Sequence, residues 1–238
     1  MIKDSIKNLG LSATLKINEK SKLIVNQDKK IIKFGFGQSP FPVPRTVVEE
    51  LKNNAHEKSY LPIQGLEKLR ISIANYESKK KKYSFHQDQV IIGPGTKELM
   101  FLMQLAFDGE IILPAPSWVS YMPQSIIAKN NYHWIQTKAE NNWFPDSHEI
   151  EEIILKNKKK KFILFINSPN NPSGQVCKNL KEISEIIKKH NILVLSDEIY
   201  SELTFDTKYE SLFRYCSRIP PNNVKKLGFI STNLKFLS

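Results

Sequence analysis

The feature that most constrains this chain is an alternation of short apolar runs with helix-length amphipathic segments. Runs of β-prone residues span 110–113, 162–166 and 192–195. Between the last two, residues 179–190 repeat leucine and isoleucine at three- and four-residue intervals, which is the spacing of one helical face. Strands that alternate with helices need right-handed crossovers between parallel neighbours. The sequence therefore predicts an α/β fold with three layers, α/β/α, around a mainly parallel sheet.

The remaining elements follow from the same periodicities. We expect helices at 45–56, 66–76, 96–107, 120–129, 147–156 and 179–190, and strands at 90–92, 110–113, 132–135, 162–166, 192–195 and 228–231. In the helix over 66–76, the leucines, Ile73 and Tyr76 are expected to form the apolar face. Residues 34–42 are rich in glycine and proline, and we treat the whole of 1–43 as irregular. The predicted organisation is an N-terminal arm, 1–43, followed by a large domain, 44–238.

The composition indicates a globular protein and excludes several other classes. Of the 238 residues, 40% are hydrophobic and 25% are charged, as in globular rather than disordered chains. No apolar run approaches the ~20 residues that cross a bilayer, and the start lacks the apolar core of a secretory signal. Two cysteines, Cys177 and Cys216, do not make a disulfide framework. We expect a cytoplasmic protein with no membrane partner.

The formal net charge of +11 comes largely from lysine runs at 79–82 and 158–161. Such runs can bind nucleic acid, but neither aromatic residues nor arginines interleave with them, as a groove that stacks on bases would need. We interpret both runs as solvated helix ends and turns, and predict no nucleic-acid partner. The five histidines show no ligand spacing with each other or with the cysteines, so no metal site is predicted.

Polar motifs follow two strands that we expect to be neighbours. N-S-P-N-N-P-S-G spans 167–174, directly after one strand, and D-E-I-Y spans 197–200, just after the next. In an open parallel sheet, the carboxyl ends of the strands form the usual ligand crevice. The sequence therefore predicts that these two motifs meet at one edge of the sheet.

The side chains of these motifs suit a small heterocycle. Asn167 and Asn171 can donate amide N–H bonds to a ring oxygen, and Tyr200 can reach the same oxygen. A carboxylate at a buried strand end, such as Asp197, needs a partner. A protonated pyridine nitrogen would serve, and the pairing would keep the ring an acceptor of electrons.

Two more groups follow the expected strands at 90–92 and 110–113. Gly95, Thr96 and Lys97 open a helix, where exposed backbone N–H groups and the positive helix end favour a phosphate. Trp118 lies in a loop at the crevice and could stack on a flat ring.

Each of these groups also has an ordinary structural explanation. Gly95 can form a plain turn, and Trp118 can fill the core. The asparagine-rich loop can be a turn before the next helix, and Asp197 can cap a turn or pair with a structural lysine or arginine. Together, however, the groups supply a phosphate cradle, a stacking face, an amide, a phenol and a carboxylate. That combination indicates a site for pyridoxal 5′-phosphate.

The motifs resemble those of the class I/II aminotransferases, the fold-type I pyridoxal-phosphate enzymes. The resemblance runs from about Phe34 to Tyr209 and is carried by N-S-P-N-N-P-S-G and D-E-I-Y in that order and spacing. Supporting matches are Y-x-x-x-x-G-L-x-x-L-R at 60–70 and G-T-K at 95–97. The arrangement looks most like the bacterial aspartate or aromatic aminotransferase branch.

The resemblance implies how the cofactor phosphate is bound. Gly95, Thr96 and Lys97 would line the phosphate site, mainly through backbone N–H groups. Tyr60 would reach the phosphate of the cofactor in a neighbouring subunit, which implies a homodimer.

The resemblance also implies how the ring and the substrate are held. Trp118 would stack on the pyridine ring, and Asn171 and Tyr200 would hold its phenolic oxygen. Asp197 would hold the ring nitrogen. Gly37, in a substrate-side loop of the N-terminal arm, would sit near the substrate carboxylate, and Trp118 and Asn171 would also face the substrate.

The catalytic lysine of the family lies at a later strand end, in an S-x-S-K or L-S-K motif, where it binds the cofactor covalently and then shuttles the proton. This chain ends T-N-L-K-F-L-S at 232–238, and T-N-L-K resembles a contracted T-N-G-L-S-K. Lys235 is therefore the candidate, together with Asp197 and Tyr200 as catalytic residues. Lys225 and Lys226 are rival candidates, and each of the three can instead be a surface lysine.

Two parts of the family pattern have no counterpart in this chain. One is the basic residue that binds a phosphate oxygen just after the catalytic lysine. The other is the small C-terminal domain, with the arginine that binds the substrate carboxylate. We therefore expect a large domain that is incomplete at its C-terminal end, with the small C-terminal domain missing.

The activity implied by the resemblance is transfer of an amino group between an L-amino acid and a 2-oxo acid, with these small molecules as partners. One alternative is a C–S lyase or decarboxylase on the same fold. A second alternative is a non-catalytic remnant that binds the cofactor without turnover.

Overall fold

The structure is a computed structural model that describes residues 4–7, 9, 13–25, 32, 37, 39, 41–216 and 227–230. The chain divides into two compact units, Met1–Tyr60 and Leu61–Ser238, and each is described by itself. The predicted domain boundary between residues 43 and 44 stays a prediction. Within the described residues, no helix is long and apolar enough to cross a membrane.

The described part of the first unit carries helices α1 (Asp4–Lys7), α2 (Ala13–Val25) and α3 (Arg45–Asn54). Helix α3 confirms an expected helix and begins after Pro44, whose carbonyl accepts the N–H groups of Val47 and Val48. The prediction of an irregular arm is wrong for α1 and α2. The α2 sequence is rich in lysine, leucine and isoleucine and lacks glycine and proline, so helix propensity prevails there.

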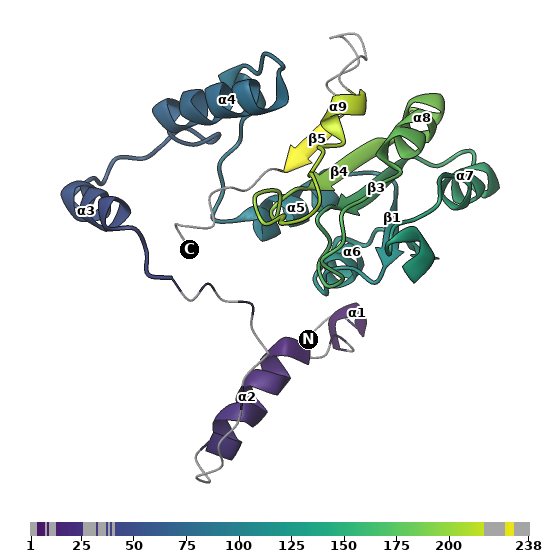
Figure 1. Cartoon of the computed structure of the whole chain (residues 1–238), viewed down its shortest axis with the longest axis horizontal. Coiled ribbons are helices and arrows are strands. Elements are labelled where there is room, and N and C mark those ends of the chain that lie inside the picture. Colours follow the sequence, from purple (N-terminus) through teal and green to yellow (C-terminus); the bar gives the residue numbers. More distant parts are fainter. Residues whose placement is uncertain are drawn as a thin grey trace. The chain divides into compact units, whose positions relative to one another are not determined.

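The second unit is built around a five-stranded sheet (Figure 1). Its strands are β1 (Glu110–Ala115), β2 (Tyr132–Gln136), β3 (Phe162–Asn167), β4 (Leu193–Asp197) and β5 (Leu227–Ile230). The order across the sheet is β2-β1-β3-β4-β5, and every neighbouring pair is parallel. The predicted α/β fold with a mainly parallel sheet is therefore confirmed.

Helices cover both faces of this sheet (Figure 1). They are α5 (Thr96–Ala106), α6 (Tyr121–Ala128), α7 (Ser147–Lys156) and α8 (Leu180–His190), with the short α9 (Phe213–Cys216) and the 3₁₀ turns η1 (Gln87–Gln89) and η2 (Ala139–Asn141). The helices α5 to α8 fall within or close to the predicted ranges. The sequence did not predict α9.

Successive side chains of a strand point to opposite faces of the sheet, so alternate residues pack into the two helical layers. On one face, Ile111 and Phe165 pack with Met100 of α5 and Tyr121 of α6. All four are at most 1% exposed. This packing fixes the start of α6 against the middle of the sheet.

The opposite face packs against α7 and α8. Ile112 and Leu164 of the strands lie in one cluster with Ile150 of α7 and Ile183 of α8, and all four are fully buried. Full burial of each such side chain contributes roughly 1.5–3 kcal/mol. With a helical layer on each face, the predicted three-layer α/β/α arrangement is confirmed.

The expected strand at 90–92 does not join the sheet. Val90 has extended backbone angles, but the N–H of Ile92 donates to the carbonyl of Gln64, 2.9 Å away, in a loop. Ile91 is 62% exposed. The segment is extended, as its β-branched residues favour, but among the described residues it pairs with a loop instead of a strand.

Helix α4 (Glu67–Lys81) buries a polar face, which contradicts the predicted apolar one. Its buried residues are Arg70, Ala74 and Glu77. Leu66, which precedes the helix, and Tyr76 are 45% and 50% exposed. Buried charges need partners. Arg70 donates to the carbonyl of Gln87 in η1, 3.1 Å away, and ion pairs form at the C-terminal end of the helix.

Candidate active site

The carboxyl ends of β3 and β4 are joined side by side. Asn167 pairs with Asp197 in the sheet register, and both residues are 5% exposed. The amide Nδ2 of Asn167 donates to the backbone carbonyl of Asp197 over 2.9 Å. The N–H of Ser168 donates to the same carbonyl over 3.2 Å. The two polar motifs therefore meet at one sheet edge, as the sequence predicts.

The asparagine-rich loop is held by its own side chains. Asn167 Oδ1 accepts the N–H of Asn171 over 2.7 Å. Asn170 Oδ1 accepts both the N–H and the hydroxyl of Ser173, over 3.1 and 2.9 Å. The buried amide of Asn167 thus holds the loop, and its predicted hydrogen bond to a ring oxygen stays a prediction. The predicted bond from Asn171 to the same oxygen likewise stays a prediction.

Asn171 and Tyr200 lie next to each other across the two loops. The amide Nδ2 of Asn171 donates to the hydroxyl oxygen of Tyr200 over 3.3 Å, and both side chains are half-buried. An amide and a phenol are thus placed together at the sheet edge, where a single oxygen of a ligand can meet both.

The carboxylate of Asp197 is held by two donors. Its Oδ2 accepts the hydroxyl of Tyr121 over 2.7 Å, and its Oδ1 accepts the N–H of Ile199 over 3.2 Å. Burial of Tyr121, and next the negative charge of Asp197, raise the pKa of this phenol well above its usual range. The phenol therefore stays protonated and donates.

Tyr121 is the site residue that the sequence analysis missed. It is the first residue of α6, directly after the loop that follows β1, and the sequence placed it only inside an expected helix. The available signal was its spacing from Trp118, because residues three apart at a helix start lie on one side. The two rings are in edge contact, with centroids 5.5 Å apart at 80°.

Trp118 and Lys97 also lie together. The ammonium of Lys97 is 5.6 Å from the centroid of the Trp118 ring. Gln124 of α6 donates to the carbonyl of Lys97 over 2.8 Å, which joins the start of α5 to α6. Trp118 is only half-buried at the edge of the core. One part of its ring therefore packs inward while another part remains accessible to a ligand.

The start of α5 has the properties of an anion site. Gly95 precedes the helix with a φ of 118°, which disfavours residues with a side chain, and it provides no side-chain cap. The first helical bond runs from the N–H of Leu99 to the Gly95 carbonyl, 3.4 Å. A Cβ at Gly95 would meet nothing within 4 Å. The nearby residue Thr96 is 8% exposed.

The described part of the second unit does not test the roles predicted for five residues. Gly37 and Tyr60 belong to the first unit, and both are exposed. Lys235 and its rivals Lys225 and Lys226 lie outside the described residues. Their predicted roles stay predictions.

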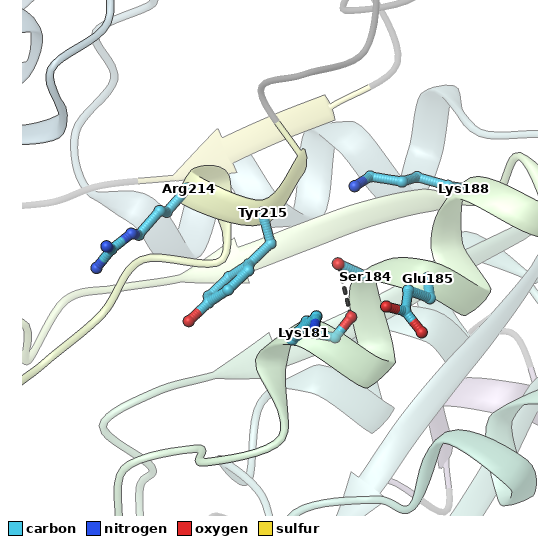
Figure 2. Close-up of a pocket in the computed structure, with 6 residues that line it drawn as sticks. All are labelled: Lys181, Ser184, Glu185, Lys188, Arg214 and Tyr215. Atoms are coloured by element: carbon cyan, nitrogen blue, oxygen red, sulfur yellow. Dashed lines mark hydrogen bonds between the residues drawn. The ribbon is translucent and has the colours of Figure 1, made fainter.

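A separate pocket of about 390 Å³ lies between α8 and α9 (Figure 2). Its lining residues are Lys181, Ser184, Glu185, Lys188, Arg214 and Tyr215. Arg214 is paired with Glu210 over 2.5 Å. The described lining contains no residue of the strand ends. We therefore place the candidate active site at the carboxyl edge of the sheet.

The family comparison agrees with this geometry. The model for aminotransferase class I and II matches residues 29–225. The chain belongs to this family. The resemblance that the motifs carry is thereby confirmed, and the fold is that of the large domain of a class I and II aminotransferase.

Individual members of the family are similar over most of this chain. An aspartate aminotransferase from Thermotoga maritima is 31% identical over 219 residues, which are 89% of this chain and 57% of that protein. An asparagine–oxo-acid transaminase from Streptococcus mutans is 31% identical over 203 residues, 82% of this chain and 51% of that protein. The chain thus spans a little over half the length of these curated relatives.

Solved structures show the same extent of similarity. The crystal structure of aspartate aminotransferase from Thermotoga maritima matches with a TM-score of 0.83 and 30% identity, over 90% of this chain and 58% of that one. The aspartate aminotransferase from Thermus thermophilus with maleate gives a TM-score of 0.86 at 24% identity, over 98% of this chain and 60% of that one. The second match concerns the fold alone.

Proposed function

We propose that the protein binds pyridoxal 5′-phosphate and, as an aminotransferase, moves an amino group between an L-amino acid and a 2-oxo acid. The observation that carries this proposal is the polar cluster at the ends of β3 and β4. It combines the buried carboxylate of Asp197 with the adjacent side chains of Asn171 and Tyr200. Membership of the aminotransferase family supports the same cofactor.

The residues present fit the cofactor by charge and by hydrogen bonding. The uncapped start of α5 offers backbone N–H groups to a phosphate, and Gly95 leaves space beside them. Ser117 Oγ, next to Trp118, is buried and has no hydrogen-bond partner among the described residues. A buried hydroxyl of this kind is costly unless a ligand or water satisfies it. The carboxylate, amide and phenol then suit the ring.

The cofactor, when bound, supplies a pyridine ring that accepts electrons from the substrate. Asp197 would hold a proton at the ring nitrogen, and Asn171 and Tyr200 would hold the phenolic oxygen. Trp118 would stack on one ring face and exclude water from it. Lys235 would move the proton to and from the substrate carbon.

The remaining assignments belong to the same proposal. Thr96 and Lys97, with Gly95, would bind the phosphate, and a second copy of the chain would add its Tyr60, so we propose a homodimer. Gly37 would sit near the substrate carboxylate. A cytoplasmic location accords with two cysteines that are both buried thiols outside any disulfide.

Binding of pyridoxine 5′-phosphate tests the proposal. This ligand keeps the ring and the phosphate but lacks the aldehyde, so it cannot react with the many surface lysines. Calorimetry should detect one site in the unsubstituted chain and a large loss of affinity in Asp197→Ala. The matched control is Asp206→Ala, at an exposed loop carboxylate, which should bind as the unsubstituted chain does. Equal affinities of both variants would count against the proposal.

A further inference from the structure

We propose that Tyr121 is a positioning residue for the cofactor ring, because it fixes the carboxylate of Asp197 that would meet the ring nitrogen. The inference rests on the proposed function. It starts from the hydrogen bond of 2.7 Å between the Tyr121 hydroxyl and Asp197 Oδ2. It is the carboxylate of Asp197, and not the phenol, that would touch the cofactor.

The phenol itself is rigidly placed. Tyr121 is 1% exposed, and its ring lies in edge contact with Phe165, with centroids 5.0 Å apart. A second edge contact joins it to Trp118, at 5.5 Å. Rings packed on two sides cannot swing away, so the position of the hydroxyl is determined by the core of the sheet.

Rotation of a carboxylate about its last bond has a broad, shallow profile. In Asp197, Tyr121 holds Oδ2 while the N–H of Ile199 holds Oδ1. Both oxygens are therefore oriented before any ligand binds, and binding needs less ordering of the side chain. Loss of the phenol hydroxyl would leave Oδ2 without this fixed donor.

Tyr121 also links two groups that would hold the ring. Its hydroxyl donates to Asp197, the proposed partner of the ring nitrogen. Its ring is in edge contact with Trp118, the proposed stacking residue. The distance between the stacking face and the carboxylate is thereby set by one buried side chain. We expect this link to matter for ligands that carry a basic ring nitrogen.

Two ligands separate this role from a purely structural one. The first is pyridoxine 5′-phosphate, and the second is its deaza analogue, with carbon in place of the ring nitrogen. Tyr121→Phe should weaken binding of the first by about tenfold or more, as expected for one hydrogen bond to a charged group, and leave binding of the second nearly unchanged. The ultraviolet spectrum of bound pyridoxine 5′-phosphate should shift toward the form unprotonated at nitrogen.

Tyr83→Phe is the matched control, because the Tyr83 ring packs on Phe85 and Phe213 instead. It should bind both ligands as the unsubstituted chain does. In an Asp197→Asn background, Tyr121→Phe should cause no further loss for the nitrogen-bearing ligand. Melting temperatures check folding, and the comparison of two ligands within one variant remains valid if Tyr121→Phe is less stable.

The outcomes are distinguishable. If Tyr121→Phe lowers the affinity for both ligands equally, or for neither, the positioning role is overturned while the proposed function stays intact. The positioning role would also be overturned if Tyr121→Phe weakened binding of pyridoxine 5′-phosphate as much in the Asp197→Asn background as it does alone. Failure of the unsubstituted chain to bind pyridoxine 5′-phosphate would overturn the proposed function and this inference together.

Discussion

The side-chain amide of Asn167 donates to the backbone carbonyl of Asp197 over 2.9 Å and so ties the end of β3 to the end of β4. The oxygen of the same amide accepts the N–H of Asn171. One buried side chain thus sets the relative position of the two loops that carry the candidate ring-binding groups. The side chain of Asn167 is buried in this network, whereas that of Asn171 is half-buried and donates to Tyr200.

Asn167→Ala should destabilise the fold. It removes one buried and one partly buried hydrogen bond and leaves the Asn171 N–H without its acceptor, which costs about 1–3 kcal/mol. Chemical denaturation measures the free energy of unfolding, with Asn141→Ala, at an exposed position, as the control. If the two variants unfold at the same denaturant concentration, the structural role of Asn167 is wrong.

Asn171→Ala should instead affect the ligand. Its side chain is half-buried and donates to Tyr200, so its loss should change stability little. Binding of pyridoxine 5′-phosphate should weaken by about 2- to 10-fold, as for one neutral hydrogen bond. Calorimetry on Asn171→Ala and Asn141→Ala provides the comparison. Unchanged affinity in Asn171→Ala would remove it from the site.

A buried ion pair next to the site should dominate local stability. Lys81 Nζ lies 3.0 Å from Glu198 Oε2 and 3.3 Å from Glu77 Oε2, and its side chain is 6% exposed. Lys81→Met should cost about 3–5 kcal/mol, because it leaves buried carboxylates without this cation. Denaturation of Lys81→Met and of the exposed control Lys79→Met measures this. Similar stabilities would show that the pair contributes little.

The buried thiols should make the fold sensitive to alkali. Burial raises the pKa of the Cys177 thiol from 9.0 to about 12. As the pH rises above 9.0, the unfolded chain loses this proton and the folded chain keeps it, so stability falls. Between the two values, Cys177→Ala should lose stability less steeply than the unsubstituted chain in urea denaturation. Parallel curves would contradict burial of the thiol.

The lysine that binds the cofactor can be mapped chemically. We expect borohydride reduction of the chain mixed with pyridoxal 5′-phosphate to fix the cofactor on Lys235, with competing pyridoxine 5′-phosphate suppressing the reaction. Peptide mass spectrometry locates the modified lysine, and Lys235→Ala is the control variant. If the cofactor is instead fixed on Lys225 or Lys226, and the competing ligand suppresses that labelling, the cofactor-binding lysine is one of these rivals.

Much of the second unit was predictable, because its central strands β1, β3 and β4 are buried on both faces. A fully buried strand such as β3 reads as a continuous apolar run, F-I-L-F-I, that few other structures explain. The adjacency of Asn171 and Tyr200 then followed from two consecutive parallel strands being neighbours. In these segments, local pattern and tertiary packing favour the same structure.

The features that the sequence did not predict depend on contacts between residues far apart in the chain. Tyr121 meets Asp197 from 76 residues away, and no local pattern marks that hydrogen bond. Lys81, at the end of α4, pairs with Glu198, and the spacing of apolar residues along the helix could not indicate this ion pair. The extended segment 90–92 had the composition of a strand, but its hydrogen bond goes to a loop.

The most direct measurement is a crystal structure of the chain with pyridoxine 5′-phosphate. We predict the ring against Trp118, its nitrogen within hydrogen-bond distance of Asp197, and the phosphate at the start of α5. The cationic pocket between α8 and α9, with Lys181, Lys188 and Arg214 in its lining, provides the contrasting location (Figure 2). Ligand found there, with the sheet edge empty, would contradict the account.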